Sequence, residues 1–171
     1  MQRQRIAGTL CVLVLTVGSF GATPGDSSAL PADGVHWHTD LHAARIVARA
    51  TNRPLLLVFD DPRCEHSRRL HAMTLSHPQM VDYIERRFVP VRLDLETGAH
   101  AAHVLGVSAL PTSIVMSPQA DLLGRVVGFV DGHRYYAVLA ASRRLHERIE
   151  LEESAPLGIT PSLPVHSPHT P

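Results

Sequence analysis

One cysteine that follows a buried strand is the residue best placed for chemistry. The apolar run Leu55–Phe59 predicts that strand, and the polar segment behind it leads through Cys64 into a predicted helix. The free amides and the dipole at a helix start stabilise negative charge, so they favour the thiolate of Cys64 over its thiol. Arg63 and His66 could add positive charge beside the sulfur. Ser67, one turn away at most, could donate a hydrogen bond to it. These residues predict a reactive thiol.

Two other interpretations of these residues stay open. Cys64 could be a small buried hydrophobe without reactivity, and Ser67 could be an ordinary polar residue in the first helical turn. The neighbours of Cys64 are Arg63, Glu65 and His66, residue types that are mostly exposed or only partly buried. This composition favours the reactive interpretation of Cys64, whereas both interpretations of Ser67 remain equal.

The first 22 residues predict export. Two arginines precede the apolar run Leu10–Val17, and small residues follow up to Ala22. A basic stretch, a short apolar core and a small-residue cleavage site are typical of a secretory signal peptide, whereas a bilayer span needs about 20 apolar residues. Cleavage near Ala22 would remove Cys11 and leave Cys64 as the only thiol, unable to form an internal disulfide. An uncleaved anchor is the alternative. We expect a periplasmic or otherwise exported protein without stable membrane insertion after cleavage.

Length and composition predict one folded domain with extensions. The 171 residues are enough for a single core. Residues 23–34 are rich in Pro, Gly, Ser and Asp and predict a linker, whereas residues 152–171, rich in Pro, Ser, Thr and His, predict a disordered tail. The domain is therefore expected at residues 35–151. Basic and acidic residues number 16 each, so we expect no basic face and no nucleic-acid partner.

Hydrophobic periodicity inside this domain alternates between helix and strand. We expect a helix after Asp40 that ends at Asn52, a strand over 55–59, a helix over 65–87 with a kink or restart at Pro78, a half-buried strand over 89–95, a short helix over 100–105, strands over 112–116 and 123–130, and a helix over 132–150. Strands separated by helices favour parallel pairing, and the last two strands favour an antiparallel hairpin. The pattern predicts an α/β domain with a mixed sheet between helices.

The segment Cys64-Glu65-His66-Ser67 after a buried strand resembles the Cys-x-x-Cys active site of the thioredoxin superfamily, with serine in place of the second cysteine. Val107–Thr112 resembles the family segment whose proline, here Pro111, is cis and faces the active-site cysteine. Phe88–Asp94 and the Trp-containing opening at Val35 also resemble the family, so the likeness spans residues 35–148. It implies a thioredoxin fold with a mixed central sheet of about four or five strands flanked by helices.

The sequence departs from the family pattern at three positions. Ser67 replaces the resolving cysteine, so the domain cannot cycle alone between dithiol and disulfide. Arg63 stands where tryptophan is usual, and Val58 stands where true thioredoxins have a buried aspartate. His66 matches a histidine of strongly oxidising periplasmic members, where it stabilises the thiolate.

The resemblance implies thiol-disulfide exchange by a monothiol reductase or isomerase, through a mixed disulfide at Cys64. Ser67 and His66 are its expected catalytic neighbours, and Arg63 is an expected substrate-binding residue. Leu110, Pro111 and Thr112 would line the groove for an extended client peptide. The expected partners are cysteine-containing client proteins or a small thiol, with the protein itself a monomer. The alternative is a redox-silent binding module or chaperone that uses the same groove.

Other candidate sites are weaker. His36, His38 and His42 could suggest a metal site, but two alternate histidines need a rigid third ligand that the predicted helix start does not supply. A Cys–His nucleophile would need His71, which lies two turns from the cysteine. A peroxidatic site would need a threonine where Asp61 stands. We therefore expect no metal and no cofactor.

Overall fold

A four-stranded mixed sheet in the order β2-β1-β3-β4 organises residues 34–154, the part of the chain that the computed structural model describes. The strands are β1 (Leu55–Phe59), β2 (Val89–Leu93), β3 (Thr112–Met116) and β4 (Leu122–Val127). Strand β1 pairs in parallel with β2 and antiparallel with β3, and β3 and β4 form an antiparallel hairpin. This topology confirms the predicted α/β fold with a mixed sheet.

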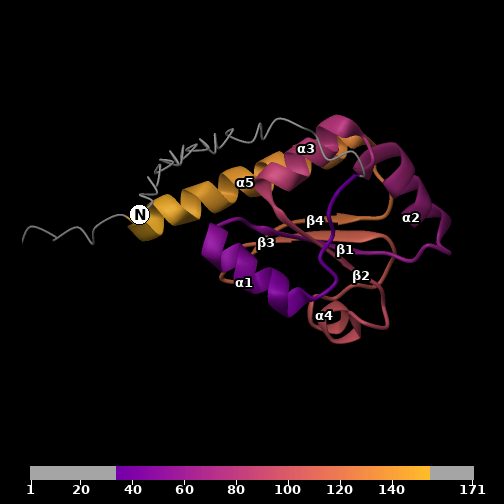
Figure 1. Ribbon diagram of the computed structural model, residues 1–171, viewed down its shortest axis with the longest axis horizontal. Coiled ribbons are helices and arrows are strands. Elements are labelled where there is room, and N and C mark those ends of the chain that lie inside the picture. Colours follow the sequence, from indigo (N-terminus) through magenta and orange to yellow (C-terminus); the bar gives the residue numbers. More distant parts are fainter. Residues whose placement is uncertain (1–33, 155–171) are drawn as a thin grey trace, which may run out of the picture.

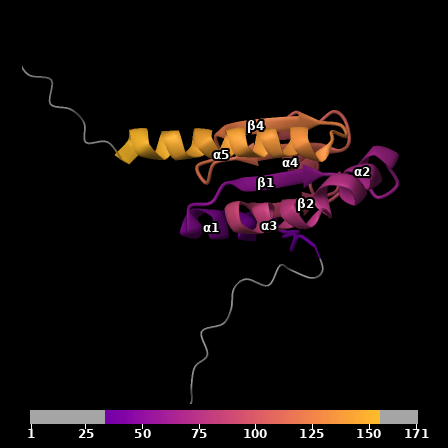
Figure 2. The same cartoon turned by 90° about the horizontal axis from the view of Figure 1, so that it is seen from above.

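Helices cover both faces of this sheet (Figures 1 and 2). They are α1 (Leu41–Thr51), α2 (Glu65–Leu70), the π-helix η1 (His71–Leu75), α3 (Pro78–Arg87), α4 (Ala99–Val104) and α5 (Gly132–Ser154). Helix α5 lies over β4 and α3 over β2 on one face, whereas α1 and α4 pack on the other. Within residues 34–154, no helix is both long enough and apolar enough to span a bilayer.

Strand β1 joins the two halves of the core. Leu56 and Val58 face the cluster beneath α3 and α5, whereas Leu55, Leu57 and Phe59 face the cluster beneath α1. Each of these side chains is at most 2% exposed, and burying one such side chain fully stabilises the fold by about 1.5–3 kcal/mol. The strand is therefore a rigid support for the loop that follows it and that carries Cys64.

The direction of β3 differs from the expectation for strands separated by a helix. Helix α4 precedes β3, yet β3 runs antiparallel to β1 and not parallel to it. The six residues of α4 extend only about 9 Å, and a five-residue strand extends about 16 Å. Because α4 is too short to carry the chain back along the sheet, β3 starts at the same end of the sheet where β2 finished. It therefore runs in the reverse direction.

The helix expected over residues 65–87 is divided into three parts. Pro78 starts α3 as predicted, because its ring fits the first turn of a helix. The π-helix η1 between α2 and α3 was not predicted. In it the Ser76 amide donates to the His71 carbonyl at 2.9 Å, and Thr74 Oγ1 donates to the Val130 carbonyl at 3.2 Å. The first bond closes the π-turn, and the second is a tertiary contact that hydrophobic periodicity does not reveal.

The ends of several elements also differ from expectation. Strand β2 ends at Leu93 and leaves Leu95 exposed, and Pro90 is buried because helices cover this edge. Strand β4 ends at Val127, before the turn at Gly128. Helix α5 continues past the expected end at 150, so residues 152–154 belong to it and not to the tail, since glutamate is a good helix former. Residues 1–33 and 155–171, which hold the expected signal peptide, most of the linker and the rest of the tail, lie outside the described residues.

Gly124 allows α5 to approach β4 closely, and its replacement tests this packing. A Cβ atom at this position would lie 2.2 Å from Ser142 Oγ, which is itself buried and donates to the Val138 carbonyl at 2.9 Å. We expect Gly124→Ala to lower the free energy of unfolding by about 1–3 kcal/mol, as overpacking does. The measurement is chemical denaturation, with Ser142→Ala as the matched background. A penalty that persists in that background would contradict the assignment to the Ser142 hydroxyl.

Candidate thiol site

Cys64 lies at the N-terminal end of α2, as the N-cap residue. Its backbone is extended, with φ −76° and ψ 124°, and its neutral thiol donates to the Leu110 carbonyl and does not cap the helix, so the helix-start donors act on the ionised form. The Cys64 amide donates to the Asp61 carbonyl at 2.9 Å, and the Arg68 amide donates to the Cys64 carbonyl at 3.1 Å. The side chain is partly exposed. A sulfur at the start of a helix and open to solvent can be reached by a reactant.

Hydrogen bonds at the helix start lower the pKa of Cys64. The largest contributions come from the backbone amide of Ser67 and then from its hydroxyl, with a smaller one from the amide of His66. Desolvation and the negative charge of Asp61 act in the opposite direction but do not outweigh them. Because these donors interact more strongly with the ionised sulfur, the site favours the thiolate.

Ser67 is held by the loop that precedes the helix. Its side chain is 1% exposed, and its Oγ accepts a hydrogen bond from the Asp61 amide at 3.3 Å. That contact occupies a lone pair of Oγ, so the hydroxyl proton remains available for Cys64. Buried hydroxyls are held by their partners, and this contact fixes the Ser67 hydroxyl on the first turn of α2.

The side-chain charges of Arg63 and His66 contribute differently from expectation. The guanidinium of Arg63 binds Asp61 in a bidentate ion pair, with Nη2 2.8 Å from Oδ2 and Nε 3.1 Å from Oδ1. Hydrogen bonds from Arg63 lower the pKa of Asp61, so Arg63 compensates the carboxylate that opposes the thiolate. His66 acts on the sulfur through its amide, and its side chain is exposed. The thiolate is therefore stabilised chiefly by hydrogen bonds.

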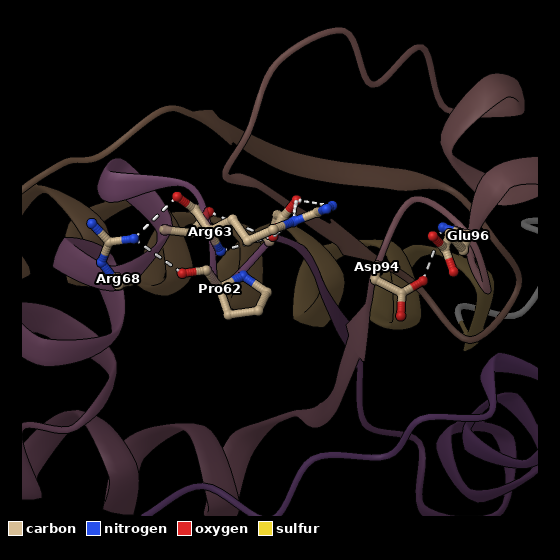
Figure 3. Close-up of polar contacts among 7 residues, drawn as sticks. Pro62, Arg63, Arg68, Asp94 and Glu96 are labelled. Carbon is tan, nitrogen blue, oxygen red and sulfur yellow. Dashed lines mark hydrogen bonds and ion pairs between the residues drawn. The ribbon is translucent and has the colours of Figure 1, made fainter.

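Arg68 fixes the loop from the other side. Its Nη1 donates to the carbonyls of Pro62 at 3.2 Å and Arg63 at 3.0 Å. Figure 3 shows the guanidinium directed to these two oxygens. The loop ahead of Cys64 is thus bound to α2 by side chains from the helix itself, which holds the sulfur in place relative to the helix start.

The expected cis proline lies next to the sulfur. The Leu110–Pro111 peptide bond is cis, and the Leu110 carbonyl accepts from Cys64 Sγ at 3.8 Å. The Pro111 carbonyl accepts from the Gly128 amide at 2.7 Å, which supports the loop from below. Thr112 lies behind this pair. It is buried in β3 between two paired strands, and its hydroxyl donates to Ala109 at 2.7 Å. The structure brings Leu110 next to the thiol and leaves it partly exposed, whereas Pro111 and the Thr112 side chain are buried behind it.

A family model for the thioredoxin-like domain matches residues 41–143. This range is more than half of the chain, and it contains both the strand-loop-helix unit around Cys64 and the cis-proline loop. The chain belongs to the thioredoxin-like domain family. No individual curated protein matches its sequence significantly.

Solved structures agree with this family assignment. A structure described as the DsbH oxidoreductase superposes with a TM-score of 0.61 at 13% identity, covering 73% of this chain and 95% of that chain. A thioredoxin from Thermus thermophilus superposes with a TM-score of 0.55 at 20% identity, covering 71% of this chain and 92% of that one. At sequence identities this low, the similarity to these two structures shows a shared fold alone.

This thioredoxin-like domain also contains a buried ionic cluster that sequence reasoning missed. Asp60, at the end of β1, is 2% exposed, and its carboxylate contacts His71 Nε2 and lies 3.0–3.1 Å from Arg92 Nε. Burial alone would raise the pKa of Asp60, but the hydrogen bonds from His71 and Arg92 together lower it. The ring of Trp37 packs edge-on against His71 with centroids 6.2 Å apart. The sequence signal for this cluster is Arg92, a charged residue within the strand predicted over residues 89–95.

The other candidate residues of the sequence lie apart from one another. The His36 amide donates to Glu85 on α3, and His38 forms a bridge with Val91 of β2. His71 contacts Asp60 and makes no hydrogen bond with the cysteine. Within residues 34–154, no group of three His, Cys, Asp or Glu side chains is arranged to hold a metal ion.

Replacing Ser67 by alanine tests the source of the thiolate. This change removes the hydroxyl and keeps the Ser67 amide, so we expect the pKa of Cys64 to rise because one of its two main donors is lost. At pH values below the pKa of Cys64, the rate of alkylation should fall about threefold to tenfold. This is the effect expected from the loss of one hydrogen bond to a charged group in a partly exposed site. The measurement is the pH dependence of alkylation by iodoacetamide. An unchanged profile would show that the hydroxyl does not act on the sulfur.

Proposed function

We propose that this protein carries out thiol-disulfide exchange as a monothiol, with Cys64 as its nucleophile. The observation that supports the proposal most directly is the position of Cys64 Sγ. It lies at a helix start where the amide and hydroxyl of Ser67 favour the thiolate, and it faces the carbonyl of Leu110 beside the cis proline. A nucleophile and a surface for an extended peptide are thus adjacent.

The chemistry begins with attack on a disulfide. The Cys64 thiolate forms a bond to one sulfur of the substrate while the substrate S–S bond breaks, and the second substrate sulfur leaves as a thiolate that takes up a proton. The product is a mixed disulfide at Cys64, and the number of disulfides is unchanged. The depressed pKa of Cys64 increases the fraction of the reactive form at neutral pH.

Release of the product needs a thiol from outside the chain. Ser67 occupies the place of the resolving cysteine, and a hydroxyl cannot break a mixed disulfide. Attack by another cysteine of the same client would isomerise that client and release Cys64. Reduction by a small thiol takes two molecules: the first attacks Cys64 Sγ and releases the reduced client, and the second frees Cys64 while the oxidised small-thiol disulfide leaves. Both routes regenerate the free Cys64 thiol, so the site can act as an isomerase or a monothiol reductase.

Substrate binding is proposed for the surface around Leu110 and Pro111. An extended client peptide can lie beside the cis-proline loop and bind through its backbone. Arg63, with 87% of its side chain exposed, lies next to the nucleophile and can contact the client on the other side. Disulfide-containing clients are found in oxidising compartments, which agrees with the export that the first 22 residues predict.

A small aromatic disulfide tests this function. We would use the full chain carrying Cys11→Ser, so that Cys64 is the only thiol. The folded protein should release one equivalent of the coloured aromatic thiolate and gain the mass of the retained half, and an added thiol should reverse the adduct. Cys64→Ser in the same background is the matched control. A thiol that reacts only after denaturation would contradict the proposal.

A further inference from the structure

The buried cluster of Asp60, His71 and Arg92 has no role in the exchange chemistry described above. It joins three separate elements, because Asp60 follows β1, His71 starts η1 and Arg92 lies in β2. A buried carboxylate is costly unless it is paired, and Asp60 is paired on both oxygens. Such a contact restricts how its three elements can move relative to one another.

The cluster is connected to Cys64 through α2. This helix has only six residues and ends where His71 begins η1. At its start, Ser67 Oγ accepts from the Asp61 amide, which adjoins Asp60 in the chain. Asp60 therefore holds the far end of α2 through His71, while its neighbour Asp61 holds the near end through Ser67. Both ends of the helix that carries the thiolate donors are thus attached to the residues that follow β1.

We propose that Asp60 is a positioning residue for Cys64. By holding His71, its carboxylate fixes the short helix α2 and with it the position of Ser67 one turn from Cys64. This role rests on the proposed function of Cys64 as a nucleophile. Asp60 itself makes no contact with the sulfur and takes no part in bond making.

The negative charge of Asp60 and its anchoring contact with His71 have opposite effects on the pKa of Cys64, so the positioning role can be tested. Asp60 is negative, so removing its charge would by electrostatics alone favour the Cys64 thiolate. Loss of the anchor would instead move the Ser67 donors away and disfavour the thiolate. The ionisable groups around Asp60 are His71 from η1, Arg92 from β2 and the buried Tyr135 from α5, and all three remain in an Asp60→Asn variant. The sign of the change at Cys64 therefore separates the two effects.

The experiment measures the pH profile of Cys64 alkylation in Asp60→Asn, in the full chain with Cys11→Ser. We expect the pKa of Cys64 to rise. At about pH 6, below the ordinary thiol pKa of about 8.5, the alkylation rate follows the small fraction of thiolate, so it should fall at least about threefold. Asp94→Asn is the matched control. Asp94 is a nearby exposed carboxylate. Among residues 34–154 it accepts from Glu96, as Figure 3 shows, and from Thr97 of the same loop, so its removal should not raise the pKa of Cys64.

His71→Phe provides a second variant in case Asp60→Asn fails to fold. Phenylalanine keeps an aromatic ring against Trp37 but removes the nitrogen that contacts Asp60. It should slow alkylation in the same direction, and thermal denaturation would verify that the variant is folded. An unchanged or lowered pKa of Cys64 in the folded variants would overturn the positioning role. A different outcome would overturn the proposed function alone. In that case the wild-type chain would show the lowered pKa of Cys64 in its alkylation profile but would not exchange with a disulfide.

Discussion

Replacing Ser67 by cysteine should convert the site from a monothiol into a dithiol. Ser67 is one turn from Cys64 and lowers its pKa. Residues three apart on a helix have their Cβ atoms about 5–6 Å apart, so a small rotation can bring two sulfurs to the bonding distance of about 2.05 Å. We expect the Ser67→Cys variant to form an internal disulfide and to reduce protein disulfides catalytically. Mass spectrometry and a turnover assay with excess dithiothreitol measure both outcomes.

The gain should be large because the resolving thiol becomes intramolecular. An attached group acts at an effective concentration in the millimolar range, so resolution of a mixed disulfide should be at least about tenfold faster than with about 0.1 mM external thiol. Ser154→Cys is the control, since it adds a thiol at the exposed end of α5, remote from α2 (Figure 1). If Ser67→Cys gives no internal disulfide and no faster turnover, the groove cannot support dithiol chemistry.

Replacing Cys64 by serine or alanine should abolish disulfide-linked capture of client proteins. The mixed disulfide requires the Cys64 sulfur, and no other cysteine lies in the chain once the first 22 residues are removed. After rapid alkylation of free thiols, non-reducing electrophoresis should show linked species for the wild-type protein and none for either variant. The alternative, a redox-silent binding module or chaperone, has a different signature. Client binding that is equally strong with Cys64→Ala, and that never includes a disulfide, would favour that alternative.

The sequence predicted the parts of the site that depend on local pattern. A continuous apolar run specified β1, because a strand buried on both faces needs apolar residues at every position. The place of Cys64 at a helix start followed from the polar segment behind that strand. The cis bond before Pro111 came from the family resemblance, since a minority of X-Pro bonds are cis and composition does not reveal which ones.

The parts that depend on tertiary contacts were not predictable from local pattern. Asp60 meets residues that are 11 and 32 positions away in the chain, and no period of the sequence connects them. The π-helix likewise depends on what its side chains contact. Arg63 was expected to support the thiolate by its charge, but that expectation could not include the ion pair with Asp61. Local patterns thus locate the thiol, whereas the packed structure determines which groups stabilise it.

The pKa of Cys64 in the wild-type protein is the measurement that tests the account most directly. It can be read from the pH dependence of the alkylation rate, or from the thiolate absorbance, in the chain with Cys11→Ser. The hydrogen bonds from Ser67 predict a value below that of free cysteine, which is about 8.5. A value at or above that of free cysteine would contradict an activated thiolate, and with it the exchange function proposed for this protein.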